Sequence, residues 1–230
     1  MAEADLSIEE HGAARHGRAA LSVLGEIERV LVDCPRDSAG VRLHGIIGLS
    51  DLLAADTTVG RIAADRVGPA AVPVRAVLFD KTPRANWSLG WHQDRTVAVR
   101  ERHDVPGFGP WSIKAGVRHV EPPFAVIEAM VTLRIHLDPV PADNAPLLIA
   151  PGSHRLGRVA EPDIATAVEQ CGTVACLAER GDVWSYATPI LHASAASTGH
   201  ARRRVLQVDY SAAELTPPLI WLGLQATDTA

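Results

Sequence analysis

The 230-residue sequence has few cysteines, almost no lysine and no long apolar run. Its three cysteines, Cys34, Cys171 and Cys176, are too few and too far apart for a disulfide framework, and none has the spacing of a zinc knuckle. No stretch reaches the roughly 18 consecutive apolar residues of a membrane span, and the acidic amino terminus lacks the apolar segment of a secretion signal. These absences predict a soluble cytoplasmic protein with no membrane partner.

The chain also has fewer basic than acidic residues. The chain has 22 Lys and Arg against 27 Asp and Glu, a net charge of -5. This balance argues against a broad phosphate-binding surface, so no nucleic acid partner is expected. The basic residues are themselves uneven, because 20 are arginine and only Lys81 and Lys114 are lysine.

Apolar residues make up 47% of the chain, enough for a sizeable core, and the length suits one domain over 1–230. Residues 1–70 are predicted to be mostly helical. Apolar residues recur at helical spacing over 7–32, and a second helix is predicted over 50–67 with Ser50 as its N-cap.

After residue 70 the period changes to that of strands. The clearest strand is 130–138, where Val131, Leu133 and Ile135 alternate with polar residues. Further strands are predicted at 72–79, 87–100, 147–150, 173–178, 182–186 and 202–211, with one short helix at 163–170. The pattern predicts a mainly β fold, a sandwich or barrel over 71–221 with a helical buttress. The Gly- and Pro-rich segment 103–120 has no firm periodicity and suits a mobile loop or lid, or a plain surface excursion.

One short segment carries metal-binding chemistry. On an extended chain residues i and i+2 point to the same side, so His92 and Asp94 can converge on one point. Two His and one carboxylate with open positions are the facial triad of non-haem Fe(II) oxygenases. A His-x-Asp pattern alone is weak evidence, and the third ligand must be a distant His.

Two later features strengthen this interpretation. His192 follows a short apolar run, and the cluster Arg202-Arg203-Arg204 opens a strand about ten residues later. A guanidinium near a metal can clamp a carboxylate through two hydrogen bonds. For Arg202 and Arg204 a solvated basic turn is the preferred reading.

Together, His92-Gln93-Asp94, the turn 151–154 (Pro-Gly-Ser-His), His192 with Ser194, and Arg203 resemble the phytanoyl-CoA dioxygenase (PhyH-like) family. The resemblance covers roughly 72–221. It implies a double-stranded β-helix, a cupin-like jelly-roll, and an Fe(II)- and 2-oxoglutarate-dependent dioxygenase that consumes O2.

Carried over residue by residue, the resemblance implies that His92, Asp94 and His192 bind the iron. Arg203, eleven residues after His192, would pair with the distal carboxylate of 2-oxoglutarate, and Ser194 would assist through its hydroxyl. Related halogenating enzymes replace the carboxylate with a small residue, so Asp94 favours hydroxylation or a related oxidation.

One departure concerns the loop before the Pro-Gly-Ser-His turn. The family commonly has Asn-Gly-Pro there, whereas this chain has Asn144-Ala145-Pro146, and Ala restricts positive φ.

Four further residues are weaker candidates. Arg134, on the polar face of strand 130–138, either faces the cavity and binds substrate or co-substrate, or is solvated on an outward face. Lys81 and Asn86 precede the metal motif and could contact substrate and a cofactor carboxylate, respectively, although turn chemistry around Pro83 also explains them. His154 could touch substrate or shape the wall of the site.

The sequence therefore predicts an oxygenase that hydroxylates a small-molecule metabolite or natural-product intermediate, releasing succinate and CO2. Two alternatives remain: a non-catalytic jelly-roll binding protein with a structural metal site, and a zinc hydrolase using the same ligands. The second leaves Arg203 and Ser194 without a role.

Overall fold

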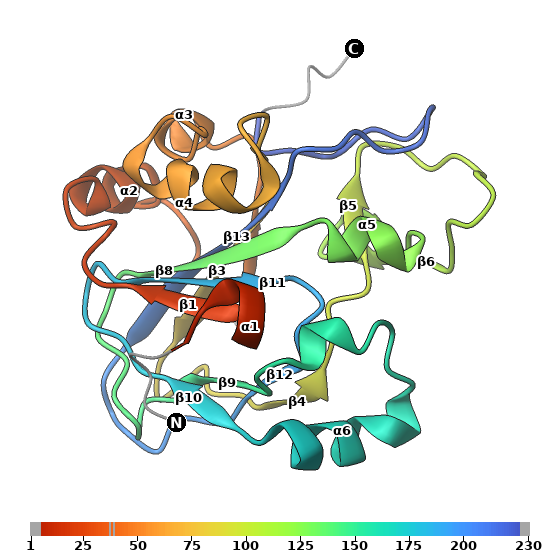
Figure 1. Cartoon of the computed structure of the whole chain (residues 1–230). Coiled ribbons are helices and arrows are strands. Elements are labelled where there is room, and N and C mark those ends of the chain that lie inside the picture. The colour runs from red at the N-terminus through yellow and green to blue at the C-terminus, as the bar shows by residue number, and fades with distance from the viewer. Residues whose placement is uncertain (1–5, 37, 39, 226–230) are drawn as a thin grey trace.

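Two antiparallel sheets and the space between them organise the molecule, with a third sheet beside them (Figure 1). The computed structural model describes residues 6–36, 38 and 40–225, so the acidic residues 1–5 considered above lie outside it. The large sheet has the strand order β1-β11-β8-β13-β3-β2. Its strands are β1 (Ala13–His16), β2 (Val41–Leu43), β3 (Val72–Lys81), β8 (Val131–His136), β11 (Val183–Ala187) and β13 (Arg203–Ser211).

The facing sheet has the order β10-β9-β12-β4, and the third sheet has the order β5-β7-β6. The facing strands are β4 (Leu89–His92), β9 (Leu147–Ile149), β10 (Val174–Cys176) and β12 (His192–Ser194). The third sheet consists of β5 (Val97–Val99), β6 (Trp111–Lys114) and β7 (Val117–Val120).

Helices α2, α3 and α4 cover the outer face of the large sheet (Figure 1). The helices are α1 (Ile8–His11), α2 (Leu24–Val30), α3 (Leu49–Leu52), α4 (Thr58–Val67), α5 (Phe124–Glu128) and α6 (Ile164–Cys171), with 3-10 turns η2 (Ser153–Arg155) and η3 (Glu161–Asp163). Leu24 and Ile27 of α2 share one apolar cluster with Leu133 and Ile135 of β8. The expected helical buttress of a mainly β fold is confirmed.

The prediction of one helix over 7–32 was wrong. Gly12 adopts φ 77° and ends α1, and the chain then forms β1, which pairs with β11. The apolar spacing that suggested a long helix belongs to the shorter α2. Pairing with a sheet edge here overrides local helical periodicity.

The predicted helix over 50–67 is two helices. Ser50 lies inside α3, whose N-cap is Gly48. Thr57 caps α4, its hydroxyl accepting from the Gly60 amide. A side-chain cap at Thr57 explains why the helix restarts there.

The segment 103–120 is only partly irregular. Its second half is the β6–β7 hairpin, with Lys114 opposite Val117. The two turn residues Ala115 and Gly116 have φ of 50° and 80°, as a tight hairpin requires. Sequence periodicity missed this hairpin because both strands are only four residues long.

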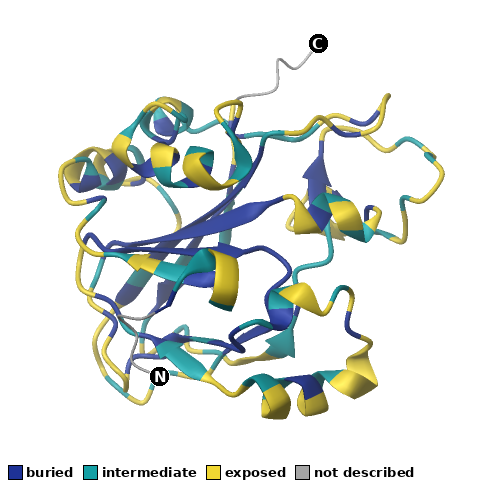
Figure 2. Ribbon diagram, viewed as in Figure 1, coloured by how far each residue is buried: buried dark blue, intermediate teal, exposed yellow. Residues whose placement is uncertain are grey.

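Strand β8 has a buried residue at every position, although its side chains alternate in polarity (Figure 2). Val131, Leu133 and Ile135 pack against the helices. Thr132, Arg134 and His136 therefore point to the other side, into the space between the sheets, and are not solvated.

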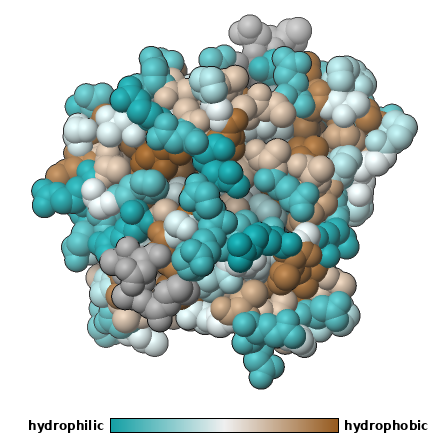
Figure 3. All heavy atoms as spheres, viewed as in Figure 1, coloured by the Kyte–Doolittle hydropathy of each residue, from teal (hydrophilic) through white to brown (hydrophobic). Residues whose placement is uncertain are grey.

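Hydrophilic and apolar residues are interspersed over the face shown in Figure 3. Within the described part of the chain, no helix has both the length and the apolar character needed to cross a membrane.

Candidate active site

A cavity of about 550 Å³ lies between the large sheet and the facing sheet. Most of the predicted site residues line it: His92, Asp94, His192, Ser194, Arg203, Lys81 and Arg134. The odd-numbered residues of β3 and β13 contribute much of the wall, since alternate residues of a strand share one face.

His92 and His192 lie directly opposite each other, because β12 pairs with β4 at these two residues. Their ring centroids are 4.2 Å apart. His92 Nδ1 lies 2.8 Å from the Gly90 carbonyl and His192 Nδ1 lies 2.9 Å from the Ile190 carbonyl. A carbonyl oxygen holds the Nδ1 proton in each ring, so both Nε2 atoms are available as metal ligands.

Asp94 follows the end of β4 and lines the same cavity. Gln93, the residue between His92 and Asp94, donates from its side-chain amide to the Pro189 carbonyl at 2.8 Å and to the Gly157 carbonyl at 2.9 Å. Asp94 Oδ2 accepts from Arg75 Nη2 at 3.2 Å, and Arg75 also donates to Asp209. The carboxylate is thus turned towards Arg75.

Among the described residues, no three His, Cys, Asp or Glu side chains are arranged so that they could hold a metal ion as they stand. The donor set nevertheless suits iron, because two imidazole nitrogens and one carboxylate oxygen converge on one cavity.

The charge state of this group also suits a metal. Burial raises the pKa of the Asp94 carboxyl, but Arg75, His192 and His92 outweigh burial and lower it to about 2. Burial, then His92, lowers the pKa of His192 to about 4. At neutral pH the site therefore presents an ionised carboxylate and a neutral His192 imidazole, the forms that coordinate a cation.

Arg203 is 2% exposed, and its guanidinium faces the cavity without a carboxylate partner in the described part of the chain. Its Nη1 donates to the Ala145 carbonyl, while its Nε has no partner. Burial, then Arg134, lowers the pKa of Arg203 to about 9. An unpaired buried guanidinium is costly, so this end of the cavity is suited to an anion.

Ala145 adopts φ 51°, the left-handed conformation that the Asn-Gly-Pro form of this loop reaches without strain. The residue keeps the conformation although Ala costs about 1–2 kcal/mol more there. Its carbonyl accepts from Arg203 and, at 3.3 Å, from Ser194 Oγ. The loop at Ala145 therefore contacts both Arg203 and Ser194 through its backbone.

Lys81 and Arg134 add two more buried cations to the same end, and we refer to Lys81, Arg134 and Arg203 as the inner cations. Lys81 lies opposite Arg203 in the β3–β13 register. Its Nζ contacts Ser194 Oγ at 3.3 Å and donates to the Ala195 carbonyl at 2.7 Å. Burial, then Arg203 and Arg134, lowers the pKa of Lys81 to about 7.

Arg134 is 5% exposed and donates to Gln207 Oε1 at 2.9 Å, and its Nε has no partner. Of the two readings of Arg134, the structure supports the one in which it faces the cavity.

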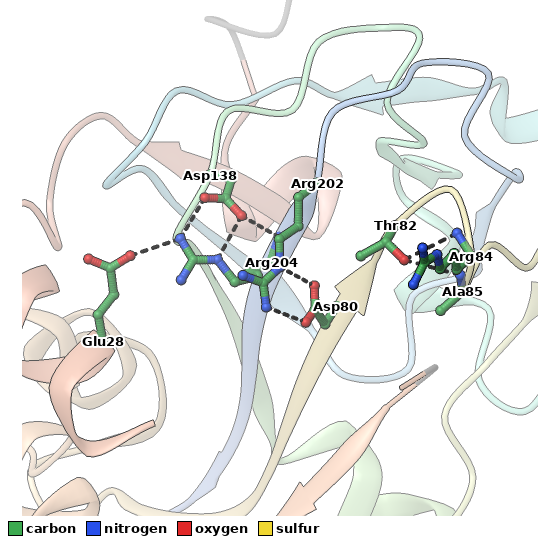
Figure 4. Close-up of polar contacts among 8 residues, drawn as sticks. All are labelled: Glu28, Asp80, Thr82, Arg84, Ala85, Asp138, Arg202 and Arg204. Carbon is green, nitrogen blue, oxygen red and sulfur yellow. Dashed lines mark hydrogen bonds and ion pairs between the residues drawn. The ribbon is translucent and has the colours of Figure 1, made fainter. Parts of the chain in front are cut away.

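Arg202 and Arg204 do not line the cavity, and both form ion pairs (Figure 4). Arg202 holds both oxygens of Asp80 at 2.8 and 2.6 Å. Arg204 bonds to Asp138 at 2.7 and 2.9 Å and to Glu28 at 2.9 Å. Arg202 is therefore solvated, as expected, but also ion-paired, whereas Arg204 is only partly exposed.

Two candidates lie outside the cavity. Asn86 is exposed, and its amide bonds at both ends to the Ser197 backbone at 2.8 Å, so it fastens the turn after Pro83. The His154 ring packs so closely on Gly12 that a Cβ there would lie 2.3 Å from it. Neither residue lines the cavity, so contact of Asn86 with a cofactor and contact of His154 with substrate stay predictions.

Four cationic residues of the cavity wall were not predicted as site residues: Arg42, Arg75, Arg95 and Lys114. Arg75 lies in phase with Lys81 on β3, which a strict two-residue period would have indicated. Lys114 is the second of the chain's two lysines, and both line this cavity. Arg42 gave no signal, because its strand lies in a region predicted to be helical.

The comparisons with known proteins agree with this geometry. The family model for phytanoyl-CoA dioxygenase (PhyH) matches residues 42–205, starting earlier and ending earlier than the resemblance seen in the motifs. No curated protein matches the chain.

Solved structures share the fold at low identity. EctD from S. alaskensis in its apoform has a TM-score of 0.66 and 16% identity, covering 96% of this chain and 79% of its own. SnoK, a non-heme alpha ketoglutarate dependent carbocyclase from nogalamycin biosynthesis, has a TM-score of 0.59 and 18% identity, covering 98% and 90%. HygX from Streptomyces hygroscopicus, with nickel and 2-oxoglutarate bound, has a TM-score of 0.57 and 13% identity, covering 89% and 84%.

These structures are double-stranded β-helix proteins, so the predicted jelly-roll is confirmed. The extent of the family match is what establishes membership, since it spans most of the chain. The chain belongs to the phytanoyl-CoA dioxygenase family and is a non-haem iron enzyme dependent on 2-oxoglutarate.

Proposed function

We propose that this enzyme hydroxylates a small molecule, with His92, Asp94 and His192 as the iron ligands and Arg203 as the anchor of the distal carboxylate of 2-oxoglutarate. The observation that carries the proposal is the buried, carboxylate-free guanidinium of Arg203 in the cavity that the three ligands line. A structural metal site would have no use for such a group, and neither would a zinc hydrolase.

When bound, iron and 2-oxoglutarate supply the oxidising chemistry: O2 and 2-oxoglutarate give succinate and CO2, and one oxygen atom enters a C–H bond of the substrate. The chain's own residues orient 2-oxoglutarate and neutralise its negative charge. Arg203 and Ser194 fix the far carboxylate, and Lys81 and Arg134 add positive charge around it. Asp94 keeps a carboxylate at the position where a halogenating enzyme needs space.

Arg75 positions Asp94 in this scheme. It is held by Asp209, whose second oxygen accepts from Thr132 Oγ1 at 3.0 Å. Burial lowers the pKa of Arg75, but Asp209 and Asp94 outweigh burial and raise it above its usual value, so it remains charged. A fixed cation beside Asp94 keeps this carboxylate ionised before iron arrives.

The test is succinate formation by protein loaded anaerobically with Fe(II), ascorbate and 2-oxoglutarate and then exposed to O2. We expect a slow signal without substrate that is lost in Asp94→Ala. The matched control is Asp163→Ala, which removes an exposed carboxylate outside the cavity and should leave succinate formation unchanged.

Metal and 2-oxoglutarate binding are measured separately by calorimetry with Ni(II) in place of iron. Absence of binding by the unmodified chain, or an Asp94→Ala variant that retains both metal binding and succinate formation, would overturn the proposal.

A further inference from the structure

The cavity carries far more positive than negative charge. Among the residues that the structure describes, its wall contains one carboxylate, Asp94, and the cations Arg42, Arg75, Lys81, Arg95, Lys114, Arg134 and Arg203. Two of the cations are already compensated. Arg75 pairs with Asp94 and Asp209, and Arg95 lies 3.8 Å from Glu161 and donates to the Val159 carbonyl at 2.5 Å.

The inner cations are accounted for by the proposed function, because 2-oxoglutarate brings two negative charges to the end of the cavity where they lie. The remaining two are Arg42 and Lys114, which we call the outer pair. Neither has a carboxylate within ion-pair distance in the described ranges 6–36, 38 and 40–225.

Arg42 is half-buried and Lys114 is exposed, and each lies on a paired strand at the cavity wall. Arg42 lies opposite Val77 in the β2–β3 register, on the face that lines the cavity, and its buried Nε has no hydrogen-bond partner. Lys114 ends β6 at the tip of a tight hairpin, and its Nζ lies 3.1 Å from Thr96 Oγ1, another residue of the cavity wall.

The two cations repel the positive charge around them. Burial, then Arg75, lowers the pKa of Arg42. Burial, then Arg75, also lowers the pKa of Lys114, with Arg42 contributing and Asp94 opposing. An arrangement in which like charges face one cavity is relieved by an anionic ligand.

2-Oxoglutarate cannot supply that anion while it is bound at the inner end. Arg75, beside the outer pair, and Lys81, at the inner end, are six residues apart on β3, a span of roughly 20 Å. The terminal carbons of a five-carbon diacid lie only about 5 Å apart. Asp94 contacts Arg75, so this proposed metal ligand lies on the side of the outer pair.

We propose that the substrate of this enzyme is itself anionic, and that Arg42 and Lys114 bind its carboxylate or phosphate group at the outer end of the cavity. This inference rests on the proposed function, since it places 2-oxoglutarate at the inner end. The anchored anion fixes the distance of the rest of the substrate from the metal ligands, so the outer pair determines which C–H bond is presented.

The test uses protein loaded with Ni(II) and saturating 2-oxoglutarate, so that the inner end is filled. Three monosubstituted benzenes are titrated by calorimetry: benzoate, its neutral isostere benzamide, and phenyl phosphate. We expect benzoate, phenyl phosphate or both to bind at least about tenfold more tightly than benzamide. A charge-assisted hydrogen bond is about twice as strong as a neutral one. The ranking of benzoate against phenyl phosphate distinguishes a carboxylated from a phosphorylated substrate.

In the double variant Arg42→Gln/Lys114→Met, we expect anion affinity to fall at least about tenfold while metal and 2-oxoglutarate affinities stay the same. Arg118→Gln is the matched control, because it removes one exposed positive charge from the same hairpin outside the cavity.

Equal binding of benzoate, phenyl phosphate and benzamide overturns the inference, as does anion binding that survives the double variant. So does an absence of saturable anion binding by protein that still binds Ni(II) and 2-oxoglutarate. A double variant that loses 2-oxoglutarate affinity instead would mean that the co-substrate occupies the outer end. Failure of the unmodified protein to bind metal or 2-oxoglutarate is a different result and counts against the proposed function.

Discussion

Arg202, Arg203 and Arg204 are consecutive in the sequence but belong to two different electrostatic environments. Arg202 and Arg204 lie on the outer side of the large sheet, where Asp80, Asp138 and Glu28 neutralise them (Figure 4). Arg203 lies on the inner side, and its described contacts include a carbonyl but no carboxylate. The alternation of a strand thus separates structural from ligand-binding arginines within three residues.

The difference extends to the whole of each region. On the outer side Arg202 and Arg204 each have an acidic partner, so their charges are neutralised by other residues of the protein. In the cavity, Lys81, Arg134 and Arg203 have only neutral oxygen partners among the described contacts. Burying such charges is tolerated when a ligand supplies the missing counter-ion, and an unsatisfied cation is therefore better evidence of a binding site than a paired one.

The largest expected effect comes from removing the unpaired arginine. Arg203→Ala should weaken 2-oxoglutarate binding by about 2–4 kcal/mol, or roughly 30- to 1000-fold, as expected for a truncated buried charge pair. The measurement is the Kd for 2-oxoglutarate, by calorimetry on Ni(II)-loaded protein.

Two further variants sharpen the contrast. Arg203→Met keeps most of the volume and removes the uncompensated charge, so the free energy of unfolding without ligand should not fall. Arg203→Lys should restore part of the affinity, because a lysine keeps the charge but loses the two-pronged geometry. Unchanged 2-oxoglutarate affinity in Arg203→Ala would show that the wrong arginine carries the co-substrate.

A smaller effect is expected from the pH dependence of the inner cations. The pKa of Lys81 is lowered to about 7 by burial and by Arg203 and Arg134, so without ligand it loses its proton as pH rises through 7. Bound 2-oxoglutarate favours the charged form and raises this pKa again. Binding then takes up a proton above pH 7, and affinity should fall by up to about tenfold per pH unit.

The check is the Kd for 2-oxoglutarate between pH 6.5 and 8.5. Lys81→Met should bind 2-oxoglutarate more weakly at pH 6.5 and show little further loss as pH rises. Lys114→Met removes the chain's other lysine and should keep the pH dependence. A slope that persists in Lys81→Met would assign the titration to a different group.

The sequence predicted what depends on local order along the chain. The spacing of His92 and Asp94, and of His192 and Arg203, follows from strand alternation and from the family motifs, and these residues line one cavity. Strand β8 was found almost to its ends because its polarity alternates over its full length. The helical buttress followed from apolar spacing, although its boundaries did not.

The sequence could not predict what depends on pairing between distant segments. The partners of Arg202 and Arg204 come from α2 and from the ends of β3 and β8, so nothing near residue 202 indicated an ion pair. Asn86 and His154 were chosen for their chemistry and position, but the contacts with Ser197 and Gly12 that occupy them arise only in the fold. Arg42 could not be identified from the sequence, because its short strand β2 forms by pairing with the distant strand β3.

The smallest expected effect is on the outer side, and it is the complement of the first prediction. Arg202→Ala leaves the Asp80 carboxylate, 1% exposed, without its two guanidinium donors, and should lower the free energy of unfolding by about 1–3 kcal/mol. Arg204→Ala should cost about 1 kcal/mol, because its partners Asp138 and Glu28 are partly exposed and water replaces part of the interaction. Chemical denaturation measures both, and 2-oxoglutarate affinity should remain that of the unmodified protein, since neither residue lines the cavity. If either variant weakened 2-oxoglutarate binding as strongly as Arg203→Ala, the division between a structural outer side and a ligand-binding inner side would be lost.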